Sequence, residues 1–168
     1  MGYPIVRREI RSGFEKLLQD WLADCDVVVG TATAGIPHAA WLAESQELPM
    51  AYVRSSAKAH GKRNLIEGPL AQGSRVVIIE DLISTGGSCI AAATAVREVG
   101  ANVLGVGSIF TYELSDAVER FQDAGSKYRS LTGNNALLAA ALDSGKVTVD
   151  EVESVRSWKR DPRQWKAS

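Results

Sequence analysis

The segment RVVIIEDLISTGGS, residues 75–88, places two carboxylates and a run of small residues directly after an apolar stretch. Glu80 and Asp81 can accept hydrogen bonds from vicinal hydroxyl groups, such as the 2- and 3-hydroxyls of ribose. Residues 84–88 offer hydroxyls and unobstructed backbone N–H groups at the expected start of a helix, where aligned peptide dipoles favour a phosphate. The pattern therefore predicts a site for a phosphorylated ribose.

Two glycines lie at the centre of this segment. Gly86 and Gly87 would let the backbone approach a ligand closely or adopt a positive φ, which a side chain would hinder. The alternative interpretation is structural: the two acids cap the next helix and the small residues form an ordinary turn. The sequence contains neither G-x-x-x-x-G-K-[ST] nor G-x-G-x-x-G, so the common fingerprints of nucleoside triphosphate and dinucleotide sites are absent.

A second segment, RSSAKAHGKR at residues 54–63, is basic and contains no acid. Its cations are Arg54, Lys58, Lys62 and Arg63, and it also holds His60. Taken alone, such a run is often a solvated loop. Beside a ribose phosphate site, it fits a diphosphate leaving group, whose growing charge Arg and Lys can stabilise. Gly61 and the small residues before Lys58 would let the loop open and close over the ligand.

Composition sets limits on the class of protein. The chain has 168 residues, of which 45% are hydrophobic and 23% charged, and a formal net charge of -1. This balance indicates a single globular domain over residues 1–168, with no global basic field for nucleic acid or membrane surfaces. The sequence shows no signal peptide or membrane-spanning run, so we expect a cytoplasmic protein. Cys25 and Cys89 have no metal-site spacing, and we expect both to be reduced and structural.

Strand and helix patterns alternate along the chain, which predicts an α/β fold with an open, mostly parallel sheet flanked by helices. The continuous apolar runs VVVG and RVVII fit strands that are covered on both faces. Ligands bind outside the carboxyl ends of strands in such sheets, where Glu80 and Asp81 are expected to emerge. The expected helices are residues 3–22, 38–47, 87–99, 115–124, 134–143 and 149–158, and the expected strands are residues 26–30, 50–53, 75–79, 103–110 and 128–131.

Two hydrophobic residues, two acids and a Ser/Thr-Gly-Gly turn resemble the motif with which type I phosphoribosyltransferases bind phosphoribosyl pyrophosphate (PRPP). The segment YVRSSAKAHGKRNLIEG is similar to the catalytic loop of the orotate phosphoribosyltransferases within that family. Residues 31–35, in TATAGIP, resemble the diphosphate-side loop of the same enzymes, and SIFTYEL and RSWKRDP extend the resemblance along the chain. It covers nearly the whole sequence, in order.

The resemblance implies a type I phosphoribosyltransferase fold and the transfer of a phosphoribosyl group from PRPP to orotate in pyrimidine synthesis. It further implies Mg²⁺ as cofactor, with no metal-binding residue assigned, and a homodimer with shared active sites. The implied catalytic residues are Lys58, His60 and Asp81, and Ser84 lies near orotate. The implied PRPP-binding residues are Arg54, Lys58, His60, Glu80, Asp81, Leu82, Ile83, Ser84, Thr85, Gly86, Gly87 and Ser88.

Two departures from the family pattern bear on the base and the leaving group. The chain apparently lacks an N-terminal segment that covers the base in family members, and Ser56 stands where a second cation is common. Two other functions therefore stay open: a phosphoribosyltransferase for another base, such as a purine, and a non-catalytic regulator that binds PRPP or a nucleotide. A base-competition assay, and a comparison of PRPP binding with turnover, would separate these alternatives.

Overall fold

The computed structural model describes residues 2–55 and 65–160, and within them a six-stranded sheet has the order β3-β2-β1-β4-β5-β6. Its strands are β1 (Val27–Thr31), β2 (Met50–Val53), β3 (Ile66–Glu67), β4 (Arg75–Ile83), β5 (Asn102–Thr111) and β6 (Tyr128–Gly133). All neighbouring strands run parallel except β2 and β3. The predicted open, mostly parallel sheet is confirmed.

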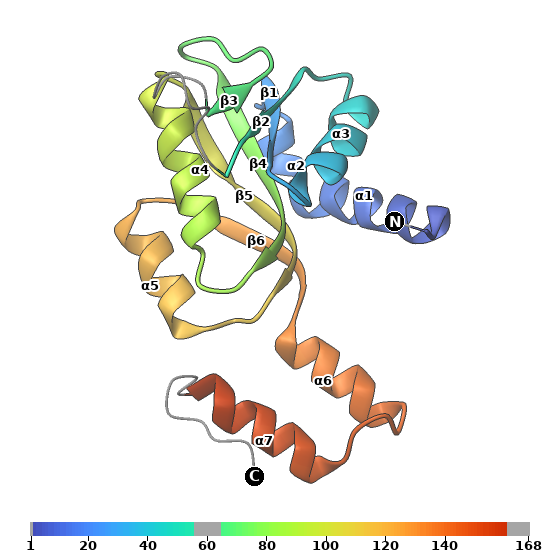
Figure 1. Ribbon diagram of the computed structural model, residues 1–168. Coiled ribbons are helices and arrows are strands. Elements are labelled where there is room, and N and C mark those ends of the chain that lie inside the picture. The colour runs from blue at the N-terminus through green and yellow to red at the C-terminus, as the bar shows by residue number, and fades with distance from the viewer. Residues whose placement is uncertain (1, 56–64, 161–168) are drawn as a thin grey trace.

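Helices cover both faces of this sheet (Figure 1). The helices are α1 (Pro4–Leu17), α2 (Gln19–Leu22), α3 (Gly35–Ser45), α4 (Gly87–Glu98), α5 (Ser115–Asp123), α6 (Asn134–Asp143) and α7 (Val149–Arg160). Successive side chains of β4 alternate between the faces, as strand geometry requires. Val76 and Ile78 pack in a core with residues of α4 and α5, whereas Val77 and Ile79 pack with residues of α1 and α3.

The structure refines several predicted boundaries. The predicted opening helix breaks at Leu18, whose φ of -108° and ψ of 13° leave the helical region. Leu18 is fully buried at this bend, so tertiary packing overrides the local helical pattern. Strand β4 runs four residues beyond the predicted end, to Ile83, because Glu80 and the residues after it still pair with β5. The antiparallel edge strand β3 was not predicted, since two residues carry no periodic signal.

Helices α6 and α7 follow the carboxyl end of β6 and lie beyond the sheet, at the bottom of Figure 1. The tip of α7 returns toward the segment after β5: the rings of Tyr112 and Trp158 meet edge to face at 5.9 Å. Lys159 Nζ lies 3.0 Å from Glu113 Oε2. Among the described residues, the helices are all too short or too polar to cross a membrane.

Candidate functional site

The segments predicted to bind the ligand meet at one edge of the sheet. Strands β1, β4 and β5 are parallel neighbours, so the loop after β1, the loop after β4 and the segment after β5 leave the same edge. Thr31 Oγ1 donates a hydrogen bond to the Ile79 carbonyl at 3.1 Å, and the Tyr112 N–H donates to the Ile83 carbonyl at 3.0 Å. These bonds tie the three segments together at the carboxyl edge, as predicted for a ligand site.

The two acids at this edge have different surroundings. Glu80 is only 5% exposed, and its carboxylate is directed toward the start of α4. Its Oε1 accepts the Asp81 backbone N–H at 3.0 Å, and its Oε2 accepts the Ser88 hydroxyl at 3.0 Å. The Cys89 thiol lies 3.6 Å from the same Oε2. Both oxygens of Glu80 therefore already have protein donors.

Burial raises the pKa of the Glu80 carboxyl, because desolvation disfavours its charged form, and the neighbouring Asp81 raises it further. Hydrogen bonds from Thr31, the Asp81 backbone and Ser88 act in the opposite direction. Burial, together with the charge of Glu80, also raises the pKa of the Cys89 thiol to about 12. Cys89 therefore stays protonated at neutral pH, in agreement with its predicted structural role.

Asp81 is half-buried at the carboxyl edge of the sheet. The negative charge of Asp81 raises the pKa of His38, in the first turns of α3, against the larger lowering effect of burial. The two adjacent acids thus differ in their surroundings: Glu80 is buried and hydrogen-bonded at the start of α4, and Asp81 is partly exposed. Of the two carboxylates, that of Asp81 is the more accessible to a ligand at the edge.

Residues 84–86 form the turn that leads into α4, and residues 87 and 88 are the first two residues of that helix. Gly86 has a φ of +77° at the N-cap position, where a side chain would be strained. A Cβ atom on Gly86 would also lie 2.8 Å from Cε2 of Phe121. Ser84, Gly87 and Ser88 are exposed, and the first turn of α4 carries no acid. The turn therefore leads into an exposed helix N-terminus, the arrangement for which the sequence predicted a phosphate site.

Leu82 and Ile83 connect the acids to this turn. The side chain of Leu82 is 38% exposed, whereas that of Ile83 is fully buried. Ile83 packs in the core with Cys89 and Phe121, so only its backbone is available to a ligand. Thr85 is half-buried between the exposed Ser84 and the buried Gly86.

Of the basic segment, only Arg54 and Ser55 lie among the described residues. Arg54 is partly buried, its backbone N–H donates to the Leu65 carbonyl at 2.8 Å, and its Nη1 lies 3.5 Å from Glu67 Oε1 on β3. Its guanidinium is therefore anchored next to the end of β2. Lys58 and His60, which the sequence also predicts in the site, lie outside the described residues.

The loop after β1, residues 31–35, packs tightly against β4. A Cβ atom on Gly35 would lie 2.5 Å from the Ile79 carbonyl oxygen and 2.5 Å from Thr31 Oγ1. Glycine is therefore required for this close approach. The peptide bond between Ala32 and Thr33 is cis. Helix α3 begins directly at Gly35, three residues before its predicted start, so its N-terminus also lies at the carboxyl edge.

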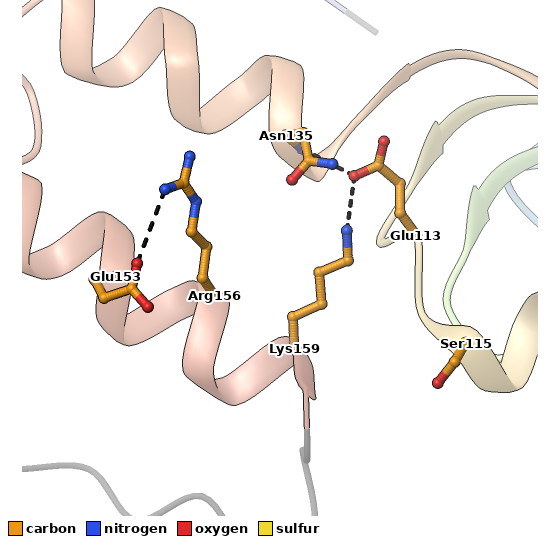
Figure 2. A pocket seen from close by; sticks show the side chains of 6 residues that line it. All are labelled: Glu113, Ser115, Asn135, Glu153, Arg156 and Lys159. Carbon is orange, nitrogen blue, oxygen red and sulfur yellow. Dashed lines mark hydrogen bonds and ion pairs between the residues drawn. The ribbon is translucent and has the colours of Figure 1, made fainter.

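A polar cavity of about 660 Å³ lies between the segment after β5 and helices α6 and α7 (Figure 2). Its described lining residues are Glu113, Ser115, Asn135, Glu153, Arg156 and Lys159. Glu113 Oε2 accepts the Asn135 backbone N–H at 3.0 Å as well as the Lys159 ammonium. Sequence reasoning missed this cluster, because its members come from three segments and form no local pattern.

Comparison with known proteins agrees with the geometry of the edge. The sequence model of the phosphoribosyl transferase domain family matches residues 4–132 of this chain. The orotate phosphoribosyltransferase of Listeria monocytogenes is 46% identical over 165 residues, which are 98% of this chain and 79% of that protein. This chain belongs to the orotate phosphoribosyltransferase family.

Solved structures of the family have the same fold. The crystal structure of orotate phosphoribosyltransferase from Aeropyrum pernix matches with a TM-score of 0.77 and 26% identity, over 88% of this chain and 80% of that one. The enzyme from Mycobacterium tuberculosis in complex with PRPP matches with a TM-score of 0.62 and 31% identity, over 74% of this chain and 70% of that one. The predicted family and the type I phosphoribosyltransferase fold are thus confirmed.

Proposed function

We propose that this chain transfers the 5-phosphoribosyl group from PRPP to orotate and produces orotidine 5-monophosphate and diphosphate. It is thus a pentosyltransferase of class EC 2.4.2.10. The observation that carries the proposal is the turn of residues 84–88, which opens α4 at the carboxyl edge beside the accessible Asp81. Membership of the family and the PRPP complex of the Mycobacterium tuberculosis relative support it.

In this reaction the bond between ribose C1 and the diphosphate oxygen breaks, and the diphosphate leaves with the electron pair. A bond then joins C1 to N1 of orotate, which gives up its proton. The transition state has oxocarbenium character, and no covalent protein nucleophile is needed. Catalysis comes from holding the two substrates in register and from stabilising the charge of the leaving group.

Each site residue has a role in binding or catalysis that follows from its position. Residues 84–88 hold the 5-phosphate at the N-terminus of α4, and Asp81 orients the ribose hydroxyls. Arg54, Lys58 and His60 stabilise the diphosphate, and Ser84 lies next to orotate. Glu80 stabilises the turn of residues 84–88 and does not contact the ligand, because Ser88 and the Asp81 backbone already donate hydrogen bonds to its carboxylate oxygens. Leu82 and Ile83 connect Asp81 to this turn.

Magnesium fits this site as an ion held mainly by the diphosphate. The described residues contain no cluster of three His, Cys, Asp or Glu side chains that could form a closed metal site. A hard cation bound to phosphate oxygens keeps several waters and needs few protein ligands, and Asp81 supplies an accessible carboxylate oxygen. The ion would neutralise charge on the departing diphosphate.

We further propose that the enzyme acts in the pyrimidine pathway in the cytoplasm, as a single domain that forms homodimers with shared active sites. The family relationship supports each of these points.

The test is a turnover assay with Mg²⁺, PRPP and orotate that follows loss of orotate and release of diphosphate. Asp81→Asn and Lys58→Ala should each lower kcat/KM by about 10²-fold, the usual scale for one electrostatic group. Glu98→Gln, an exposed change in the last turn of α4, is the control. PRPP binding without turnover would instead indicate a regulator, and turnover with adenine but not orotate would indicate a purine enzyme.

A further inference from the structure

Arg120 of α5 is an exposed cation beside the start of α4. Its Nη1 atom lies 3.8 Å from the position that a Cβ atom on Gly87 would take. Gly87 is the first residue of α4 and belongs to the segment proposed to hold the 5-phosphate of PRPP. A cation from a different helix therefore lies next to that segment.

Core packing holds α5 in this place. Phe121, the residue after Arg120, is 1% exposed and packs in the core with Ile83 and Cys89, which lie on either side of the turn. A Cβ atom on Gly86 would lie 2.8 Å from Cε2 of Phe121. Because a close-packed core leaves such a ring little freedom, the backbone of Arg120 is held beside the N-terminus of α4.

The guanidinium of Arg120 has no protein partner among the described residues. Asp116 and Asp123 belong to the same helix, at spacings where helical ion pairs often form, but neither carboxylate pairs with it. The side chain is exposed, so a ligand can reach it. The structural alternative is that Arg120 only complements the helix dipole in the last turn of α5.

The start of α4 has no side chain that satisfies its first N–H groups. Its N-cap residue is Gly86, no side-chain hydrogen bond caps the helix, and its first turn carries no acid. Such N–H groups have no partner within the helix and carry partial positive charge. Arg120 adds a full positive charge beside them, on a planar group whose N–H donors match phosphate oxygens. Both features favour a phosphate at the same place.

We propose that Arg120 binds the 5-phosphate of PRPP, together with the backbone of residues 84–88. Its guanidinium donates charge-assisted hydrogen bonds to the phosphate oxygens on the α5 side, while the N–H groups of α4 hold the others. This inference rests on the proposed function, because it takes the turn before α4 as the 5-phosphate site. The residues that the family motifs imply for PRPP binding include none from α5.

The test is calorimetric titration with PRPP and, separately, with ribose 5-phosphate, in the presence of Mg²⁺. Arg120→Gln should bind both ligands about tenfold more weakly, the scale expected when hydrogen bonds to a charged group are lost at a partly solvated site. Arg120→Lys keeps the charge but not the planar fork of donors, so it should bind both about threefold more weakly.

A control variant and two further measurements make the result specific. Lys127→Gln removes an exposed cation before β6, at the opposite edge of the sheet, and should leave both affinities within about twofold. The melting temperature of Arg120→Gln should stay within about 4 °C of the unaltered protein, since only an exposed interaction with the helix dipole is lost. In turnover, KM for PRPP should rise about tenfold with kcat within about twofold, because the 5-phosphate lies away from the breaking bond.

Unchanged affinity of Arg120→Gln for ribose 5-phosphate would refute the proposal, whether or not PRPP affinity falls. Equal weakening in Arg120→Gln and Lys127→Gln would refute it as well, because general surface charge would then explain the loss. Failure of the proposed function is recognised separately, since the unaltered protein would bind PRPP and give no turnover with orotate. An unaltered protein that binds neither ligand would overturn both proposals.

Discussion

At the scale of single residues, the adjacent acids Glu80 and Asp81 have distinct environments. A motif treats them as a pair, but Glu80 is buried and bonded to the start of α4, whereas Asp81 is partly exposed. Glu80 accepts a hydrogen bond from Ser88 at the start of α4, and Asp81 remains partly exposed. The difference supports the proposal that the first acid stabilises the turn and the second binds the ligand.

Glu80 should make stability depend on pH. Its folded pKa is raised mainly by burial, so the folded state binds the proton more tightly than the unfolded state. Stability contributed by this group is then gained as pH falls through the folded pKa, and lost as pH rises through it. The melting temperature of the unaltered protein relative to Glu80→Gln should therefore rise as the pH is lowered through the raised pKa toward the ordinary carboxyl value of 4.5.

Thermal unfolding followed by circular dichroism checks this pH dependence. Glu98→Gln, at an exposed position in α4, should show no such trend relative to the unaltered protein. A melting-temperature difference between the unaltered protein and Glu80→Gln that falls with decreasing pH would show that Glu80 is stabilised as the charged form, and the supporting role would need revision.

At the scale of elements, the start of α4 depends on two glycines in different ways. Gly86 has a positive φ, and a Cβ there would contact Phe121 at 2.8 Å. Gly87 has space, with Arg120 Nη1 as its nearest neighbour at 3.8 Å. Gly86→Ala should therefore destabilise the fold by about 1–3 kcal/mol, from backbone strain and overpacking. Urea unfolding measures the change.

Gly87→Ala is the matched control on the same turn. It should change the free energy of unfolding by less than about 0.5 kcal/mol, or stabilise the helix slightly, since Ala is the better helix former. The same variant should weaken PRPP binding if the backbone of this turn approaches the phosphate closely. An equal loss of stability in both variants would mean that the positive φ of Gly86 is not what makes glycine necessary there.

At the scale of the whole molecule, Glu113 connects the C-terminal helices to the sheet edge. Its φ is +55°. Its carboxylate accepts hydrogen bonds from the backbone N–H of Asn135, at the start of α6, and from the Lys159 ammonium. The pair is partly exposed, with 34% of the Glu113 side chain and 20% of that of Lys159 accessible, so solvent screens it. Most of its effect should come from capping α6.

Glu113→Ala should loosen α6 and α7 without unfolding the sheet. Hydrogen–deuterium exchange should speed up in both helices by about tenfold, the equivalent of roughly 1 kcal/mol from a lost cap. Exchange in β4 and β5 should stay unchanged. Arg156→Ala serves as the control, because its 3.8 Å pair with Glu153 is exposed and contributes little. Uniform acceleration over the whole chain would show that Glu113 supports the global fold.

The sequence alone determined the mostly parallel sheet, the small-residue turn before α4 and the family. The runs VVVG and RVVII are local, continuous apolar signals, and the turn belongs to a contiguous motif that needs no tertiary partner to be recognised. For the same reason, the predicted ends of helices and strands were wrong where residues distant in sequence determine them. The burial of Leu18 ended α1, and pairing with β5 extended β4 through both acids.

Only the tertiary structure showed which groups meet across distant segments. Glu113, Asn135 and Lys159 lie apart along the chain, and no local spacing connects them with one another. The crossover of parallel strands brings α3 beside Asp81 and the segment after β5 beside Ile83. Sequence patterns report local periodicity and turn chemistry, whereas side-chain partners depend on which segments the fold places side by side.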